Sequence, residues 1–374
     1  MGLQELKIIF DNPIYYPGET VKGKLFIFLD TPQKYRGIRI QIKGVAQTFW
    51  RVTKKETDNS LRHTAKKSTE SFAHEEYFSR RFYIAGGHAG ETELPSGEHV
   101  RPFEYKLPQN LPSSFESEFG SIRYTAKAIF GFPWGFNQEI EHAFKVVSNC
   151  DLNRDPRAKK PVMVEKCKAF GCYCTLSTIT ANLSIPLGGY VPGQSIPVNV
   201  DLENKSGIKI SNVKLTLHKN VIYRVKKPRA DEKTKSFIEA EISKGPMEYK
   251  GMISYKQVLK VPDLQPSTLN TCGIITINYT LKLEADVKRW CCRRRSLKII
   301  TPILIGTVPI ANYQSLVASG QQNDRIRRKV NSEGFSPGAA VYCTAAPPTY
   351  QEPILRARKY PEENASETSP LIPK

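Results

Sequence analysis

The sequence has no long apolar run and almost no helical periodicity. No stretch of 18 apolar residues occurs among its 374 residues, so we expect no helix that spans a bilayer. The first ten residues lack the apolar core of a signal peptide, and position 6 is Leu where an N-myristoylation signal requires Ser or Thr. These absences predict a cytoplasmic protein with reduced thiols.

Motifs of the common enzyme classes are missing as well. The chain contains no GxGxxG, no P-loop, no GxSxG and no HExxH, and its six histidines are dispersed. Among the eight cysteines, Cys167, Cys172 and Cys174 lie closest to a cluster, but their spacing differs from the CxxC pairs typical of structural zinc. We therefore expect no catalytic residue, no bound metal, no cofactor and no disulfide framework.

Acidic residues are scarce relative to basic ones, 36 against 55, which gives a net charge of +19. This balance favours an anionic partner such as acidic lipid, acidic peptide or nucleic acid. Few aromatic residues lie between the basic ones, which argues against nucleic acid, although a basic nucleic-acid-binding β protein stays an alternative.

One basic segment, 290–295, combines a tryptophan, two cysteines and three arginines between two expected strands. Arg293, Arg294 and Arg295 are our candidate contact with anionic lipid, each contributing on the order of 1 kcal/mol. Cys291 and Cys292 are candidates for palmitoylation. The alternative is an ordinary cationic turn.

Strict alternation of apolar and polar residues dominates from residue 4 to about 305. In 38–43, for example, Ile38, Ile40 and Ile42 share one face of the expected strand. The segments 21–29 and 275–283 alternate in the same way. This period is typical of half-buried antiparallel strands, and many short strands with Pro/Gly turns predict an all-β protein built from sandwiches.

An internal repeat at one constant offset, which carries position 15 onto position 190, predicts two such sandwiches. The turn Tyr15-Tyr16-Pro17-Gly18 aligns with Tyr190-Val191-Pro192-Gly193, and the two strands that follow align without a gap over about 27 residues. We expect a first sandwich over 1–150, a polar linker over 151–172, a second sandwich over 173–307 and a disordered tail over 308–374, where apolar periodicity ceases.

The tail carries two short motifs. Pro347, Pro348 and Tyr350 form a PPxY sequence, in which the prolines favour a polyproline II turn and the tyrosine offers a flat anchor for the aromatic groove of a WW domain. Glu367, Leu371 and Ile372 match an acidic dileucine sorting signal of the kind that clathrin adaptor complexes bind. Both motifs predict docking of partners to the tail.

Several sequence blocks resemble the arrestin-domain-containing proteins, the α-arrestins. The resemblance extends over essentially the whole chain and depends on Tyr16-Pro17-Gly18-Glu19, on the blocks 102–116 and 120–124, on Gly189-Tyr190-Val191-Pro192-Gly193-Gln194 and on the closing block 302–309. It implies two tandem arrestin-like, immunoglobulin-like β-sandwiches followed by a PPxY-bearing tail. Family members often carry two PPxY motifs, whereas we find one here, so binding should lack the avidity of a pair.

By the same resemblance, the function is that of a non-enzymatic adaptor. The PPxY motif would recruit a HECT-type ubiquitin ligase, and the sandwiches would contact membrane receptors or transporters as cargo for ubiquitination, endocytosis and endosomal sorting. Peripheral association with plasma membrane and endosomes is then expected, without nucleic acid. The alternative is a cargo-binding trafficking scaffold that acts without ligase coupling.

Overall fold

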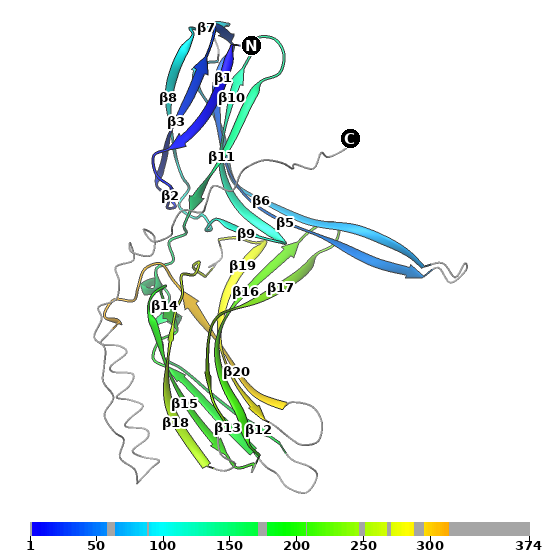
Figure 1. The fold of residues 1–374 in the computed structure, drawn as a ribbon, viewed down its shortest axis with the longest axis vertical. Coiled ribbons are helices and arrows are strands. Elements are labelled where there is room, and N and C mark those ends of the chain that lie inside the picture. Colours follow the sequence, from blue (N-terminus) through cyan, green and yellow to red (C-terminus); the bar gives the residue numbers. More distant parts are fainter. Residues whose placement is uncertain are drawn as a thin grey trace.

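The computed structural model describes residues 2–57, 64–87, 90–170, 178–206, 208–246, 251–267, 271–287 and 295–313. Within these ranges the chain is almost wholly β-strand and folds into two lobes, with a long two-stranded arm leaving the region between them (Figure 1). The expectation of an all-β protein with two tandem sandwiches is confirmed.

The first sandwich packs a three-stranded sheet on a larger one. The smaller sheet has the order β1 (Leu3–Phe10), β3 (Thr20–Leu29), β8 (Gly97–Lys106). The larger sheet has the order β2 (Ile14–Tyr15), β11 (Gln138–Val146), β10 (Gly120–Gly131), β5 (Gly37–Thr57), β6 (Thr64–Gly86), with β9 (Phe115–Ser117) beside β10. A two-stranded sheet of β4 (Gln33–Tyr35) and β7 (Thr92–Leu94) completes the lobe.

The second sandwich has the same plan. One sheet has the order β12 (Val162–Ala169), β13 (Thr178–Ile185), β15 (Ser195–Asn204), β18 (Gly251–Lys260). The other has the order β14 (Gly189–Tyr190), β20 (Arg295–Ile305), β19 (Ile275–Val287), β16 (Ile210–Val225), β17 (Asp231–Lys244). The inward positions of β19 are buried and its outward positions are not, as period-2 alternation requires.

The internal repeat is confirmed in detail. The offset that carries position 15 onto position 190 also carries both ends of β3 onto those of β15, and both ends of β2 onto those of β14. The turns between them match as well, because Gly18 and Gly193 have φ of 85° and 86°, a conformation that favours glycine. In both turns the residue that follows the glycine donates its N–H to the carbonyl three residues earlier, with N···O distances of 3.0 and 3.1 Å.

The linker and the start of the tail differ from the expected boundaries. Strand β12 lies inside the expected linker, yet it pairs with β13 along its whole length and forms the edge of the second sandwich. Residues 308–313, expected as tail, also pack on this lobe, where Ile310 is buried and the Tyr313 hydroxyl donates to the Ser195 carbonyl at 2.7 Å. An edge strand such as β12, or a short terminal segment such as 308–313, shows only a weak alternation of apolar and polar residues, because few of its side chains face the core.

Between the lobes, the linker is short and structured. It contains the 3₁₀ helix η1 (Leu152–Arg154) and the helical turn α1 (Pro156–Lys159), which are capped by the side chains of Asp151 and Asp155. Both caps accept a hydrogen bond from the second residue beyond them, at 2.9 Å. The linker therefore holds a defined conformation against the second sandwich.

Candidate functional site: the junction between the sandwiches

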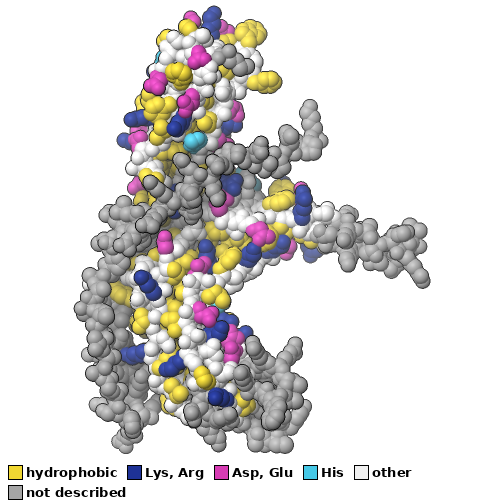
Figure 2. Space-filling model, viewed as in Figure 1, with side chains coloured by type: hydrophobic (Ala, Val, Ile, Leu, Met, Phe, Trp, Pro, Cys, Tyr) yellow, Lys and Arg dark blue, Asp and Glu magenta, His cyan; other side chains and the backbone are white. Residues whose placement is uncertain are grey.

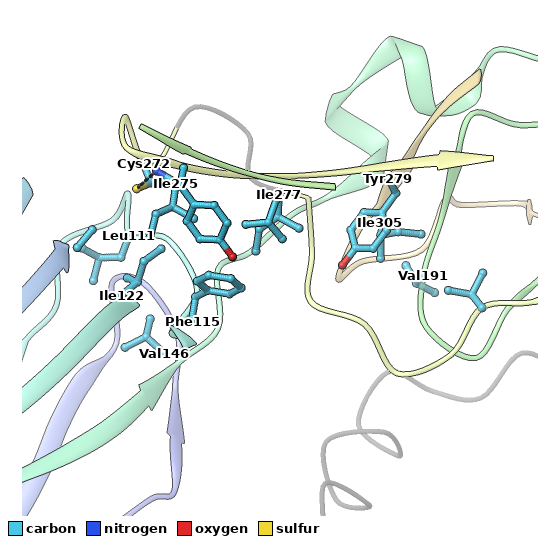
Figure 3. Close-up of a cluster of buried hydrophobic side chains, with 14 of the residues drawn as sticks. Leu111, Phe115, Ile122, Val146, Val191, Cys272, Ile275, Ile277, Tyr279 and Ile305 are labelled. Atoms are coloured by element: carbon cyan, nitrogen blue, oxygen red, sulfur yellow. Dashed lines mark hydrogen bonds between the residues drawn. The ribbon is translucent and has the colours of Figure 1, made fainter. Parts of the chain in front are cut away.

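A single apolar core crosses from one sandwich into the other. Figure 3 shows Leu111, Phe115 and Ile122 of the first sandwich facing Ile275 of the second, and all four side chains are buried. The approach is close, because a methyl group added at Gly120 would lie 3.1 Å from Ile275 Cδ1. Since burial of apolar surface stabilises the contact, the two lobes form a packed unit.

Aromatic rings and lysines surround this apolar contact. Phe119 of the first sandwich packs edge-on against Tyr223 of β16, with ring centroids 5.7 Å apart. Lys233 of β17 places its ammonium 4.6 Å from the Phe119 centroid and 5.0 Å from that of Trp50. Cation–π contacts of this kind add about 0.5–2 kcal/mol each, depending on their exposure.

Hydrogen bonds join the lobes at their polar rim. The hydroxyls of Ser117 and Tyr223 lie 2.5 Å apart, and the buried Thr48 hydroxyl donates to the Arg224 carbonyl at 2.6 Å. Beside them, the Phe72 N–H donates to the Lys227 carbonyl at 2.9 Å, so that β6 forms an antiparallel bridge with the second sandwich. The base of the β5–β6 arm is thus fixed to both lobes.

Cys272 lies at the same junction. The Glu75 carboxylate of β6 accepts the backbone N–H of the next residue, Gly273, at 3.0 and 3.2 Å. Burial raises the pKa of the Cys272 thiol, so it stays protonated at neutral pH. A buried, protonated thiol is unreactive, and we assign it a packing role.

The linker closes the junction on the opposite side. The Cys150 N–H donates to the Thr307 hydroxyl, and the Thr307 N–H donates to the Cys150 carbonyl, both at 2.8 Å. Farther along, the Asn153 side-chain amide donates to the Pro309 carbonyl at 2.8 Å. These bonds fasten the origin of the tail to the linker, at the point where the two sandwiches meet.

The outward face of β16, β19 and β20 is mostly polar, and its charged side chains bond to one another. At its centre, Glu284 accepts hydrogen bonds from Lys282, Lys298 and Ser296 at 2.7–2.8 Å. Burial alone would raise the pKa of Glu284, but these three hydrogen bonds outweigh burial and lower the pKa to about 2. The carboxylate is therefore ionised at any physiological pH, and the face presents fixed charges of both signs.

This face belongs to the hollow side of the molecule. In Figure 1 the second sandwich curves below the β5–β6 arm, with β16, β17 and β19 along that side. Figure 2 shows charged side chains of both signs around the hollow between the arm and the second lobe. A concave, charged surface framed by a projecting ribbon is suited to hold a polar segment of another protein.

The residues predicted from sequence lie almost entirely outside the part of the chain that the structure describes. Pro347, Pro348 and Tyr350 lie outside the described residues, and so do Glu367, Leu371 and Ile372. Arg293 and Arg294 lie outside them too, while Arg295 opens β20 with its backbone paired to Val287. The structure therefore leaves these predicted sites untested, and among the described residues the junction is built from other side chains.

Conversely, sequence reasoning missed the junction itself. Trp50, Phe119 and Lys233 come from three segments of the chain, and no local pattern connects them.

Two classes of site are absent from the described part of the chain. No helix there is long and apolar enough to cross a membrane. No group of three or more His, Cys, Asp or Glu side chains there is arranged to hold a metal ion.

Comparison with known proteins identifies the architecture. Residues 6–153 match the family model of the arrestin (or S-antigen) N-terminal domain, and residues 176–310 match that of the arrestin C-terminal domain. The two lobes thus define an arrestin-type tandem sandwich protein, and the matched ranges meet across the linker described above.

Whole-chain relatives are also found. Arrestin domain-containing protein 17 of Caenorhabditis elegans is 31% identical over 340 residues, which cover 85% of this chain and 75% of that protein. Arrestin domain-containing protein 4 of Mus musculus is 26% identical over 381 residues, covering 99% and 85%. Arrestin domain-containing protein 1 of the same species is 25% identical over 372 residues, covering 99% and 79%. The chain belongs to the arrestin domain-containing, or α-arrestin, family, and these relatives support an arrestin-family adaptor.

Proposed function

We propose that this α-arrestin is a non-enzymatic adaptor that brings a WW-domain HECT-type ubiquitin ligase to membrane cargo. The tail motif of Pro347, Pro348 and Tyr350 binds the WW domain. The two sandwiches bind a cytoplasmic segment of a receptor or transporter. The ligase then ubiquitinates the cargo, which is internalised and sorted through endosomes.

The observation that supports this proposal most directly is how the tail leaves the body. The chain is still fastened to the second sandwich at Tyr313, and a long segment separates this point from Pro347. When fully extended, that segment reaches at most about 110–120 Å. A ligase bound at the motif can therefore reach cargo held on the body without either contact disturbing the other.

The hollow side of the molecule is our candidate surface for cargo. Its charges are fixed in pairs, as around Glu284, so it is organised before a partner arrives. Preorganised polar surfaces give specificity at a low entropic cost. Because the tail would bind the ligase while the sandwiches bind membrane cargo, we expect the protein in the cytoplasm, with peripheral contact to plasma membrane and endosomes.

A WW-domain pull-down tests the coupling to the ligase. Tyr350→Ala removes the aromatic anchor of the motif and should weaken binding at least tenfold, as loss of a central interface aromatic commonly does. Tyr360→Ala is the matched control, because Tyr360 lies in the same tail and precedes Pro361 but does not complete a PPxY motif. Undiminished binding of the Tyr350→Ala protein would remove the main support for this function.

The dileucine motif predicts a second tail contact, with clathrin adaptor complexes. Replacing Leu371 and Ile372 by Ala should reduce recovery of the adaptor complex severalfold, because the two side chains fill apolar pockets in this class of signal. The control replaces Ile354 and Leu355, an apolar pair without an acidic residue four positions before it. Equal recovery of the two variants would contradict the motif assignment.

A further inference from the structure

The two most exposed large apolar side chains of the described residues lie in one turn. Trp134 and Phe136 are 86% and 98% exposed, and both belong to the 132–137 turn that joins β10 to β11. Single exposed apolar residues are common on protein surfaces. Two large aromatic side chains in one turn, each almost fully in water, leave unburied an apolar area that folding usually covers.

The turn that carries these two side chains is held firmly from below. Phe130 is fully buried and packs against Tyr35 and Phe132, with ring centroids 5.7 and 5.0 Å apart. The Arg36 backbone N–H donates to the Gly131 carbonyl at 2.8 Å, and its guanidinium donates to the Pro133 carbonyl. The aromatic pair is thus presented on a fixed base, which lowers the entropic cost of any contact that it makes.

The turn also projects from the molecule. Figure 1 places the end of the β10–β11 hairpin at the far end of the first sandwich, away from the second sandwich. In Figure 2, hydrophobic side chains stand out from the surface at this end. Residues 132–137 contain no charged side chain, so transfer of the turn into an apolar medium removes no ion from water.

We infer that Trp134 and Phe136 insert into the headgroup–acyl boundary of a membrane leaflet and anchor the first sandwich there. Tryptophan is suited to this boundary, because its ring is apolar while its N–H finds polar partners. A protruding, uncharged tip fits a deformable bilayer, whereas a protein partner would have to supply a deep pocket of matching shape. The net charge of +19 draws the chain towards an acidic leaflet before insertion.

This contact is separate from the arginine segment considered in the sequence. The described residues that flank that segment, Val287 at the end of β19 and Arg295 at the start of β20, pair at the far end of the other lobe (Figure 1). An aromatic anchor and a cationic contact also respond differently to salt, because screening weakens only the cationic one. The inference goes beyond the adaptor function, and either can fail without the other.

Co-sedimentation of the full chain with phosphatidylcholine vesicles, with and without phosphatidylserine, tests the anchor. Replacing Trp134 and Phe136 by Ser should lower the partition coefficient at least tenfold on both vesicle types and also at high salt. The matched control replaces Met252 and Ile300, which are 69% and 59% exposed on the second sandwich, and should bind as wild type does. Unchanged melting curves show that all variants are folded.

The outcomes separate the competing explanations. If the Trp134 and Phe136 variant sediments as wild type does, or if wild type binds neither vesicle type, the anchor is refuted and a protein partner becomes the better explanation for the turn. If changing Arg293, Arg294 and Arg295 to Glu abolishes all binding, including the salt-resistant part, the anchor is also refuted. We expect that variant to lose only the phosphatidylserine-dependent part.

Tryptophan fluorescence gives a second measurement. The chain has three tryptophans, at positions 50, 134 and 290. Vesicles of phosphatidylcholine alone, on which the arginine segment should not act, should shift the emission of wild type to shorter wavelength, and Trp134→Phe should abolish this shift while most sedimentation remains. Persistence of the full shift on phosphatidylcholine vesicles in Trp134→Phe would show that another tryptophan meets the lipid there and would overturn the inference.

Discussion

A methyl group at position 306 should loosen the joint between the linker and the second sandwich. Gly306 follows β20, and a Cβ added there would lie 2.4 Å from Leu152 Cγ and 2.8 Å from the Cys150 carbonyl oxygen. Carbon atoms in contact normally lie about 3.5–4.0 Å apart. Neither neighbour can move away easily, because Leu152 is 1% exposed and the Cys150 carbonyl accepts the Thr307 N–H at 2.8 Å. Gly306 is fixed as well, since its N–H donates to the Tyr190 carbonyl at 2.9 Å.

The expected cost of Gly306→Ala is therefore about 3 kcal/mol, at the upper end of overpacking in a filled core. For a lobe of this size such a loss lowers the melting temperature by about 10 °C. Thermal unfolding followed by circular dichroism measures it. Gly245→Ala is the matched control, because nothing lies within 4 Å of its added Cβ and it should change stability by less than about 0.5 kcal/mol.

A double mutant makes the reasoning specific to this contact. Leu152→Ala alone should cost about 2–4 kcal/mol through the cavity it leaves. Combined with Gly306→Ala, it removes the atom against which the methyl group clashes, so the double variant should be about 1–3 kcal/mol more stable than the sum of the single changes predicts. Strict additivity, or a Gly306→Ala protein as stable as the Gly245→Ala control, would refute the tight joint.

Two further predictions concern the charged face and the junction. Glu284→Gln should cost about 1–2 kcal/mol at pH 7 after allowance for solvent screening. Because the pKa of Glu284 is lowered to about 2, wild type holds this stability above about pH 4.5 and loses it as the pH falls towards 2, so urea unfolding should show the gap to the variant closing over that range. If the difference in stability between wild type and Glu284→Gln did not change with pH, the ionised carboxylate of Glu284 would not be its cause. Across the junction, Ser117→Ala and Tyr223→Phe should each cost about 1 kcal/mol with a coupling of similar size, and a coupling near zero in the double-mutant cycle would mean that their hydroxyls do not act on each other.

The repeated turn and strand could be predicted from the sequence, because the features that form them lie within a short stretch of the chain. Alternation at period 2 fixes which side chains of β3 and β15 face a core, and the Pro-Gly turn before each strand fixes where it begins. The constant offset between the two copies therefore placed both strands correctly without any knowledge of what packs against them. The PPxY and dileucine motifs are local in the same sense, since each is a short segment that a partner reads in extended form.

The junction, by contrast, was decided by tertiary structure alone. Ser117 and Tyr223 are 106 residues apart, and their contact exists only because each sandwich closes separately and then packs against the other. The exposure of Trp134 also depends on tertiary structure, because the sequence shows that an apolar residue lies in a turn but not whether another segment covers it. Local patterning determined the strands of this protein and the motifs of its tail, while long-range packing determined which surfaces stay exposed, since burial depends on contacts between segments far apart in the chain.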